Sequence, residues 1–163
     1  MFELKPIHKE AIPKALEKAE RYRLLNEPVQ AESICRDILR VDPDNQPALI
    51  TLLLALTDQF DRGLPVTRPR EFLPRLQGEY ERWYYAGLIC ERKAWAHLSQ
   101  GLPGSGFIAY DLLREAMSWY EKAEAIHPPG NDDATLRWNT CVRTIRDRRL
   151  EPRPEEAVQV MSE

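Results

Sequence analysis

Few residues in this sequence have the type and spacing that catalysis or metal binding requires. The three histidines, His8, His97 and His127, are scattered along the chain. Glu124 and His127 form one Glu-x-x-His pattern, the spacing used by di-iron helix bundles, but such sites need two copies and further carboxylates. The sequence contains no Gly-rich phosphate loop and no nucleophile motif. It therefore predicts a protein that is not an enzyme and that binds no metal or cofactor.

The cysteines also lack the pattern of a chemical site. Cys35, Cys90 and Cys141 are odd in number and about fifty residues apart. This spacing favours neither a disulfide framework nor a metal site with closely spaced ligands. We therefore interpret them as small buried apolar residues.

Composition and charge narrow the classes of protein further. The 163 residues suffice for about one domain, and 43% apolar with 30% charged residues is ordinary for a globular protein. The net charge of -3 gives no overall attraction to nucleic acid or to an anionic membrane. The charged N-terminus lacks the apolar core of a secretory signal, and the most apolar run, residues 48–56, is too short to span a bilayer. We expect a cytoplasmic protein without membrane contact.

Apolar residues recur at spacings of three and four through most of the chain, which predicts amphipathic helices. Pro28 suits a first helical position, and Asn45 suits an N-cap that is followed by Pro47 in the first helical turn. Neighbouring helices joined by two or three residues must be antiparallel. The predicted helices cover residues 8–25, 28–42, 46–56, 71–99, 107–127 and 132–148.

The helix over residues 71–99 is the least regular of these predictions. The three-and-four spacing continues across Gly78 without a slip, which favours one continuous helix with Pro74 in its first turn. A break at Gly78 is the alternative. Residues 101–106, "GLPGSG", are expected to form a loop, and residues 151–163 a disordered tail with little apolar surface to bury.

Residues 31–49 and 116–136 are near copies of each other. Ala, Ser, an aliphatic residue and Pro recur at a fixed offset of 85 positions. The matched pairs are Ala31 with Ala116, Ser33 with Ser118, Val41 with Ile126 and Pro43 with Pro128. Such a duplication predicts a helical repeat.

These residues resemble the tetratricopeptide repeat, a helix-turn-helix unit of about 34 residues with small residues where its helices touch and a proline near its end. Residues 12–45 match one unit, with Tyr22, Ala31 and Pro43 in the large, small and proline positions. Gly87 supplies the glycine of the first helix in the second copy. The resemblance implies an all-α domain over residues 1–150, built of antiparallel helical hairpins in a short right-handed superhelix of about six helices.

The resemblance also implies a concave surface, lined by the first helices of successive units, that binds an extended or helical protein segment. The chain would then be an adaptor or scaffold whose partner is an unidentified protein or peptide, and the sequence leaves open whether it forms a homo-oligomer. By matching positions, the lining would comprise Leu16, Glu20, Arg23, Ile50, Leu54, Tyr84, Tyr85, Leu88, Glu91 and Arg92. Leu16 and Glu20 stand where repeats that clamp a C-terminal carboxylate place Lys and Asn, which contradicts that specific function.

Two of these residues have alternative interpretations. Tyr85 lies off the apolar stripe of its helix, beside Arg92, so its ring needs a second surface, either another helix of the chain or a partner. Glu91 falls at the centre of that stripe, where an unpaired carboxylate would be costly. It either pairs with an arginine of a neighbouring helix or is a polar anchor in the floor of the groove.

Two groups of arginines support an alternative function, which is the binding of nucleic acid such as RNA. Few exposed aromatics for base stacking accompany the second group, and most of its members lie in the last turns of a helix, where cations favour the dipole. A protein partner is therefore favoured over nucleic acid. The groups comprise Arg62, Arg68, Arg70 and Arg75, and then Arg137, Arg143, Arg146, Arg148, Arg149 and Arg153.

Overall fold

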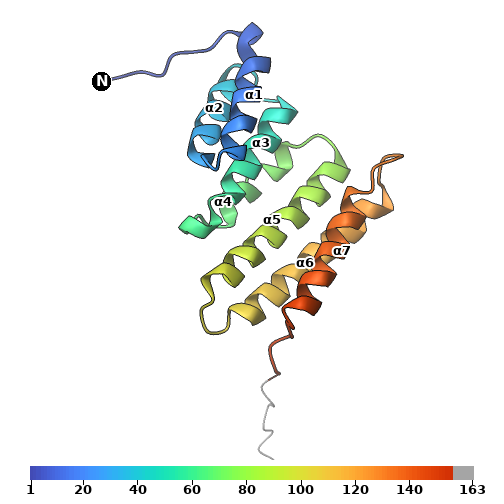
Figure 1. The fold of residues 1–163 in the computed structure, drawn as a ribbon. Coiled ribbons are helices and arrows are strands. Elements are labelled where there is room, and N and C mark those ends of the chain that lie inside the picture. The colour runs from blue at the N-terminus through green and yellow to red at the C-terminus, as the bar shows by residue number, and fades with distance from the viewer. Residues whose placement is uncertain (156–163) are drawn as a thin grey trace, which may run out of the picture.

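In a computed structural model that describes residues 1–155, all regular structure is helical (Figure 1). Most predicted helices are found within a few residues of their expected ends, and a short additional helix, α4, makes seven in the described part of the chain rather than about six. The helices are α1 (Ile12–Leu24), α2 (Pro28–Val41), α3 (Gln46–Thr57), α4 (Thr67–Arg70), α5 (Glu79–Gln100), α6 (Ser105–Ala125) and α7 (Asp133–Asp147).

The predicted helix starts are confirmed at α2 and α3. Pro28 is the first residue of α2, where its missing N–H costs no hydrogen bond. Asn45 caps α3 with its side-chain oxygen, which accepts a hydrogen bond from the Ala48 amide at 2.9 Å. The prediction for residues 101–106 was too long, because α6 already begins at Ser105.

The prediction of one continuous helix over residues 71–99 is wrong. Residues 73–75 form a separate 3-10 turn, and Leu76 and Gly78 have extended backbones, so α5 begins only at Glu79. Leu76 is buried in the core of the N-terminal helices, whereas Tyr80 is buried in the core of the C-terminal helices. The apolar spacing across Gly78 is therefore shared by residues that pack in different places.

Side chains hold this break in place. Arg82 Nη1 donates to the carbonyl oxygens of Leu76 and Gln77 at 2.8 and 3.1 Å, which satisfies acceptors that a continuous helix would have paired internally. Gln46, in the first turn of α3, accepts a hydrogen bond from the Gln77 amide at 3.0 Å. The segment before α5 is thus fixed to α3.

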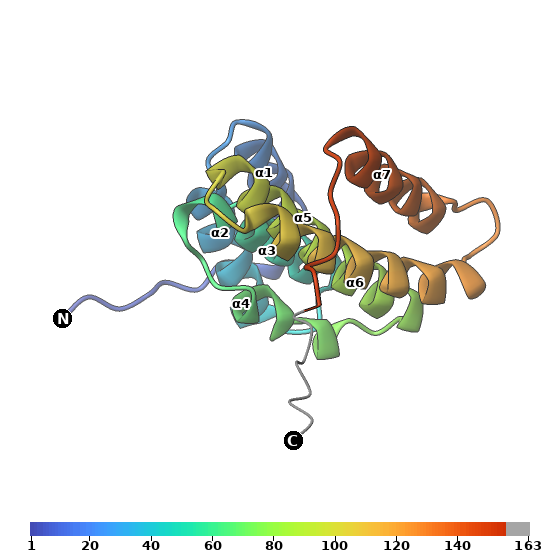
Figure 2. The same ribbon diagram turned by 90° about the horizontal axis from the view of Figure 1, so that it is seen from below.

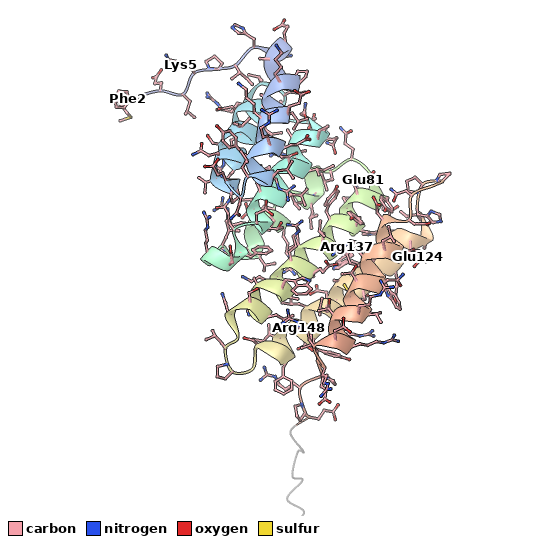
Figure 3. All side chains as sticks on the ribbon, in the orientation of Figure 1. Phe2, Lys5, Glu81, Glu124, Arg137 and Arg148 are labelled. Atoms are coloured by element: carbon pink, nitrogen blue, oxygen red, sulfur yellow. The ribbon has the colours of Figure 1, made fainter. Side chains whose placement is uncertain are left out.

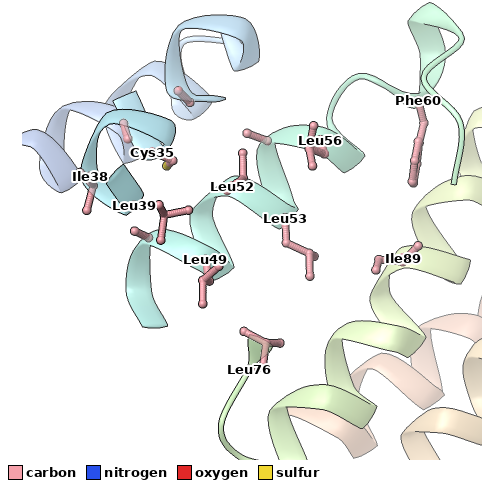
Figure 4. Packing of buried hydrophobic residues seen from close by; sticks show 14 of the residues in the cluster. Cys35, Ile38, Leu39, Leu49, Leu52, Leu53, Leu56, Phe60, Leu76 and Ile89 are labelled. Carbon is pink, nitrogen blue, oxygen red and sulfur yellow. The ribbon is translucent and has the colours of Figure 1, made fainter. Parts of the chain in front are cut away.

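The apolar residues form two cores. The first lies among α1, α2 and α3 and also contains Phe60, Leu76 and Ile89 (Figure 4). The second lies among α5, α6 and α7 and contains Cys90, Leu113 and Tyr120. The long helix α5 supplies residues to both, and Figure 1 shows it between the α1–α3 group and the α6–α7 pair.

The two alanines of the duplicated stretch are fully buried, one in each core. Ala31 of α2 and Ala116 of α6 have no exposed surface. In the second core, α5 and α6 approach closely at Gly87, where an added Cβ would lie 2.7 Å from Tyr120 Cε1. Small residues thus occur where these helices meet.

All three cysteine thiols are buried, as predicted. Burial raises the pKa of Cys35 to about 12 and that of Cys90 to about 11. Of the predicted tail, residues 151–155 are exposed and residues 156–163 lie outside the described part of the chain. The division into residues 1–150 and a disordered tail stays a prediction.

Glu32 of α2 fastens the segment that follows α3. Its carboxylate accepts hydrogen bonds from Gln59 at 3.1 Å, from Arg68 at 3.3 Å and from Arg36 at 2.7 Å. Burial acts to raise the pKa of Glu32, but the hydrogen bonds from Gln59 and Arg36 and the nearby arginine charges outweigh it, so the pKa lies below its ordinary value of 4.5. The ionised form is therefore the one that stabilises the fold.

We expect Ala31→Leu and Ala116→Leu each to lower the free energy of unfolding by about 1 to 3 kcal/mol, because the added atoms overpack a closed helix contact. Urea denaturation of each variant measures the loss. Ala125→Leu, at an exposed position of α6, is the matched control and should stay within about 0.5 kcal/mol of the parent. Equal stability of the buried and exposed variants would contradict the packing described for both cores.

Replacing Glu32 by Gln should destabilise the protein by about 1 to 2 kcal/mol at pH 7, because charge-assisted bonds to two arginines are lost. A carboxylate with a lowered pKa contributes fully above its unfolded pKa near 4.5, and the contribution disappears as the pH falls through the folded value. The difference between parent and variant should therefore narrow when denaturation is repeated at pH 4 and pH 3. A gap that is constant from pH 7 to pH 3 would show that the charge of Glu32 is not what stabilises the segment.

Candidate functional site

Glu91 of α5 is a buried carboxylate joined to two other helices. Only 2% of its side chain is exposed. Its Oε1 accepts hydrogen bonds from Tyr120 Oη of α6 at 3.1 Å, from Arg137 Nε of α7 at 3.2 Å and from Cys141 Sγ of α7 at 3.5 Å. Arg137 Nη2 completes a two-pronged ion pair with Oε2. The predicted pairing of Glu91 with an arginine of a neighbouring helix is confirmed.

This pairing changes the acid–base properties of the groups around the carboxylate. The hydrogen bond to Glu91 holds the pKa of Arg137 above its ordinary value despite partial burial. Burial, followed by the nearby Glu91 charge, raises the pKa values of Tyr120 and Cys141. Tyr120 and Cys141 therefore stay protonated, and this cluster supplies neither a nucleophilic thiolate nor a phenolate.

Asp58, the residue that follows α3, is a second carboxylate that joins three helices. Its Oδ2 accepts from Arg23 Nε of α1 at 2.7 Å, and its Oδ1 accepts from Arg92 Nη1 of α5 at 2.8 Å. Arg23 Nη2 also donates to Oδ1, at 3.2 Å. The predicted groove residues Arg23 and Arg92 thus lie on either side of one carboxylate. No pattern in the sequence singled out Asp58, because its role depends on the positions of three separate helices.

A cavity of about 340 Å³ lies where these two networks meet. Residues from the end of α3, the turn after it, α5 and α7 line it. Figure 2 shows the surrounding arrangement, with α5 between the α1–α3 group and α7. In Figure 3 the labelled Arg137 lies on the side of α7 that faces α5. The lining comprises Thr57, Asp58, Phe60, Asp61, Glu91, Arg92, Trp95, Ala96, Ser99 and Arg137.

Only Glu91 and Arg92 of the predicted groove residues line this cavity. Glu20 is exposed and Leu88 is buried, whereas the remaining predicted residues are half-buried. Trp95 and Ser99 continue the helical stripe of Arg92 by three and seven positions, a periodic signal that could have revealed them. Arg137 belonged to the second arginine group. The half-buried residues are Leu16, Arg23, Ile50, Leu54, Tyr84 and Tyr85, together with Arg92.

The aromatic run of α5 is divided between the two cores. Trp83 and Tyr84 pack against the second core, and Tyr85 packs against the first. The rings of Tyr84 and Tyr85 meet edge to face with centroids 5.0 Å apart. Of the two surfaces that the sequence allowed for Tyr85, the structure provides the one within the chain. Burial raises the pKa of Tyr84 to about 12, so its hydroxyl stays protonated.

Comparison with protein-family models, with curated proteins and with solved structures finds no match to this chain. The resemblance to the tetratricopeptide repeat stays a hypothesis that rests on the residues quoted for it. Among residues 1–155, no helix has the length and apolar character of a bilayer span, and no three His, Cys, Asp or Glu side chains are grouped as metal ligands.

We expect Glu91→Ala to lower the free energy of unfolding by about 3 kcal/mol, because Arg137 and the Tyr120 hydroxyl lose their acceptor inside the protein. Urea denaturation measures the change. Glu124→Ala is the control, since Glu124 is an exposed glutamate near the end of α6 (Figure 3).

The double variant Glu91→Leu with Arg137→Leu should recover part of this loss, because no arginine is left without an acceptor, although the Tyr120 hydroxyl still lacks one. Its recovery would assign the cost of Glu91→Ala to the unpaired groups. A loss for Glu91→Ala no larger than that of the Glu124 control would instead mean that water replaces the carboxylate at little cost.

Proposed function

We propose that this protein is an adaptor or scaffold that binds an extended or helical segment of another protein in the cavity over α5. The observation that carries the proposal is the cavity of about 340 Å³, whose lining combines Trp95 with charged side chains from α5, α7 and the segment after α3. Such a mixture of one large aromatic and a few fixed polar groups suits recognition of protein side chains. We further propose that the helices form a tetratricopeptide-like array and that the protein acts in the cytoplasm.

The rigidity of the cavity wall supports the binding of a partner. Arg92 is fixed by Asp58 and Arg137 by Glu91, so their side chains have already lost the conformational freedom that binding would otherwise cost. Arg148 Cζ lies 5.3 Å from the centre of the Trp95 ring, which is a cation–π contact. Figure 3 labels Arg148 at the end of α7.

Nucleic acid is a weaker candidate for the ligand because many of the arginines that suggested it are engaged within the chain. Arg68 pairs with Glu32, and Arg75 donates to the Pro43 carbonyl oxygen. Arg137 and Arg148 are held by Glu91 and Trp95. These contacts leave fewer cations on one face to neutralise successive phosphates.

Selection from a random peptide library displayed on phage tests the proposal. We expect enrichment of peptides whose binding to the purified protein is lost in Ser99→Arg, because the long side chain would enter the cavity from an exposed position of α5. Ser118→Arg introduces the same side chain at an exposed site of α6 outside the cavity and should bind the peptides as the parent does.

Fluorescence polarisation with labelled peptides gives the affinities, and circular dichroism melting verifies that both variants fold. Failure to enrich any peptide, or equal binding by the parent and Ser99→Arg, would overturn the proposed function.

A further inference from the structure

The two arginines that line the cavity each donate to a carboxylate of the protein and are each partly exposed. Arg137 donates through Nε and Nη2 to Glu91, and Arg92 donates through Nη1 to Asp58. In the described part of the chain, neither Arg137 Nη1 nor Arg92 Nε and Nη2 makes a hydrogen bond within the protein. Both side chains are 35% exposed and both line the cavity. Each guanidinium therefore presents unused donors to the same space.

The charges around these arginines are shared unequally between the two carboxylates. Glu91 and Arg137 form one neutral pair. Asp58, by contrast, is shared between Arg23 and Arg92, so this triad carries one positive charge more than its carboxylate offsets. Asp61 also lines the cavity and offsets this charge, so three arginines face the three carboxylates Asp58, Asp61 and Glu91. What stays available in the cavity wall is therefore the unused hydrogen-bond donors of Arg92 and Arg137, not a net positive charge.

The remaining lining limits which group can accept hydrogen bonds from these donors. Asp61 lines the cavity from an exposed position in the turn after α3, so a run of phosphates, with several negative charges, is disfavoured. A single carboxylate can accept paired hydrogen bonds from a guanidinium group. Trp95 and Ala96 supply apolar surface from the same helix as Arg92. The arrangement fits one acidic side chain next to an apolar or aromatic one.

We infer that Arg92 and Arg137 form the recognition site for one acidic side chain, Asp or Glu, of the protein segment that occupies the cavity, with a neighbouring apolar side chain against Trp95. This inference rests on the proposed function and defines the chemistry of its partner. Planar guanidinium groups suit it because their paired donors match the geometry of a carboxylate. The carboxylates of Asp58 and Glu91 that pair with them set the direction in which the remaining donors point.

A double-mutant cycle on a peptide from the phage selection tests the inference. In the peptide, each Asp or Glu is replaced in turn by Asn or Gln, and in the protein Arg92 is replaced by Gln. Asp58 keeps both of its bonds from Arg23 in this variant, so the fold should persist, which circular dichroism melting verifies. Arg143→Gln, at an exposed site of α7 outside the cavity, is the matched control.

At one acidic position of the peptide, the change to Asn or Gln should weaken binding to the parent and to Arg143→Gln about tenfold or more. The reason is that a hydrogen bond to a charged group is removed. The same peptide change should cost Arg92→Gln about threefold or less, because its partner is already absent. Equal losses for parent and Arg92→Gln at every acidic position would overturn the inference, as would selected peptides without Asp or Glu.

The outcomes separate this inference from the proposed function. Some selected peptides could bind the parent, fail to bind Ser99→Arg and show no dependence on acidic residues. Such peptides would support binding of a protein segment in the cavity and would contradict only the recognition of an acidic side chain. Peptides whose binding is insensitive to Ser99→Arg would remove both.

Discussion

The buried carboxylate of Glu91 determines how the C-terminal helices fit together. It lies on α5, takes a hydrogen bond from Tyr120 of α6 and is paired with Arg137 of α7, so one side chain sets the positions of three helices. A carboxylate at 2% exposure is tolerated only when its oxygens are occupied. Because Gly87 has no side chain, the Tyr120 ring can lie against α5, and its hydroxyl can then donate to Glu91. Packing and polar pairing in this half of the molecule are therefore interdependent.

The next residue on α5, Arg92, connects this helix to the N-terminal helices. Through Asp58 it connects α5 to α3 and α1, and Ile89 carries the apolar contact between the same elements (Figure 4). Because successive residues on a helix are turned by about 100°, two adjacent charged residues can face different neighbours. The α1–α3 group and the α6–α7 pair are thus joined by one helix that is buried on two sides. The cavity lies where these two sets of contacts come together.

Helix positions could be predicted from sequence where a local signal marks the boundary. Pro28 and Asn45 begin their helices as the rules for first positions and caps require. Local spacing failed at Gly78, since Leu76 and Tyr80 satisfy one helical period while they pack in separate cores. Glu91 could be recognised as needing a partner from its place on the apolar stripe. The identity of that partner, and the role of Asp58, depend on contacts between helices 34 to 46 residues apart in sequence, which no local pattern contains.

The sharing of α5 between two cores also affects how the molecule would respond mechanically to an occupant of its cavity. Asp58 and Phe60 belong to one half and Arg137 to the other, and all three line the same space. A ligand there would contact both the α1–α3 group and α7 and would oppose any motion that separates them. By linkage, the free energy of binding would appear as resistance to that opening, with slower amide hydrogen exchange in α1 and α7 as well as at the residues touched. Ligand binding in the cavity would thus slow amide exchange in the first and the last helix of the described chain.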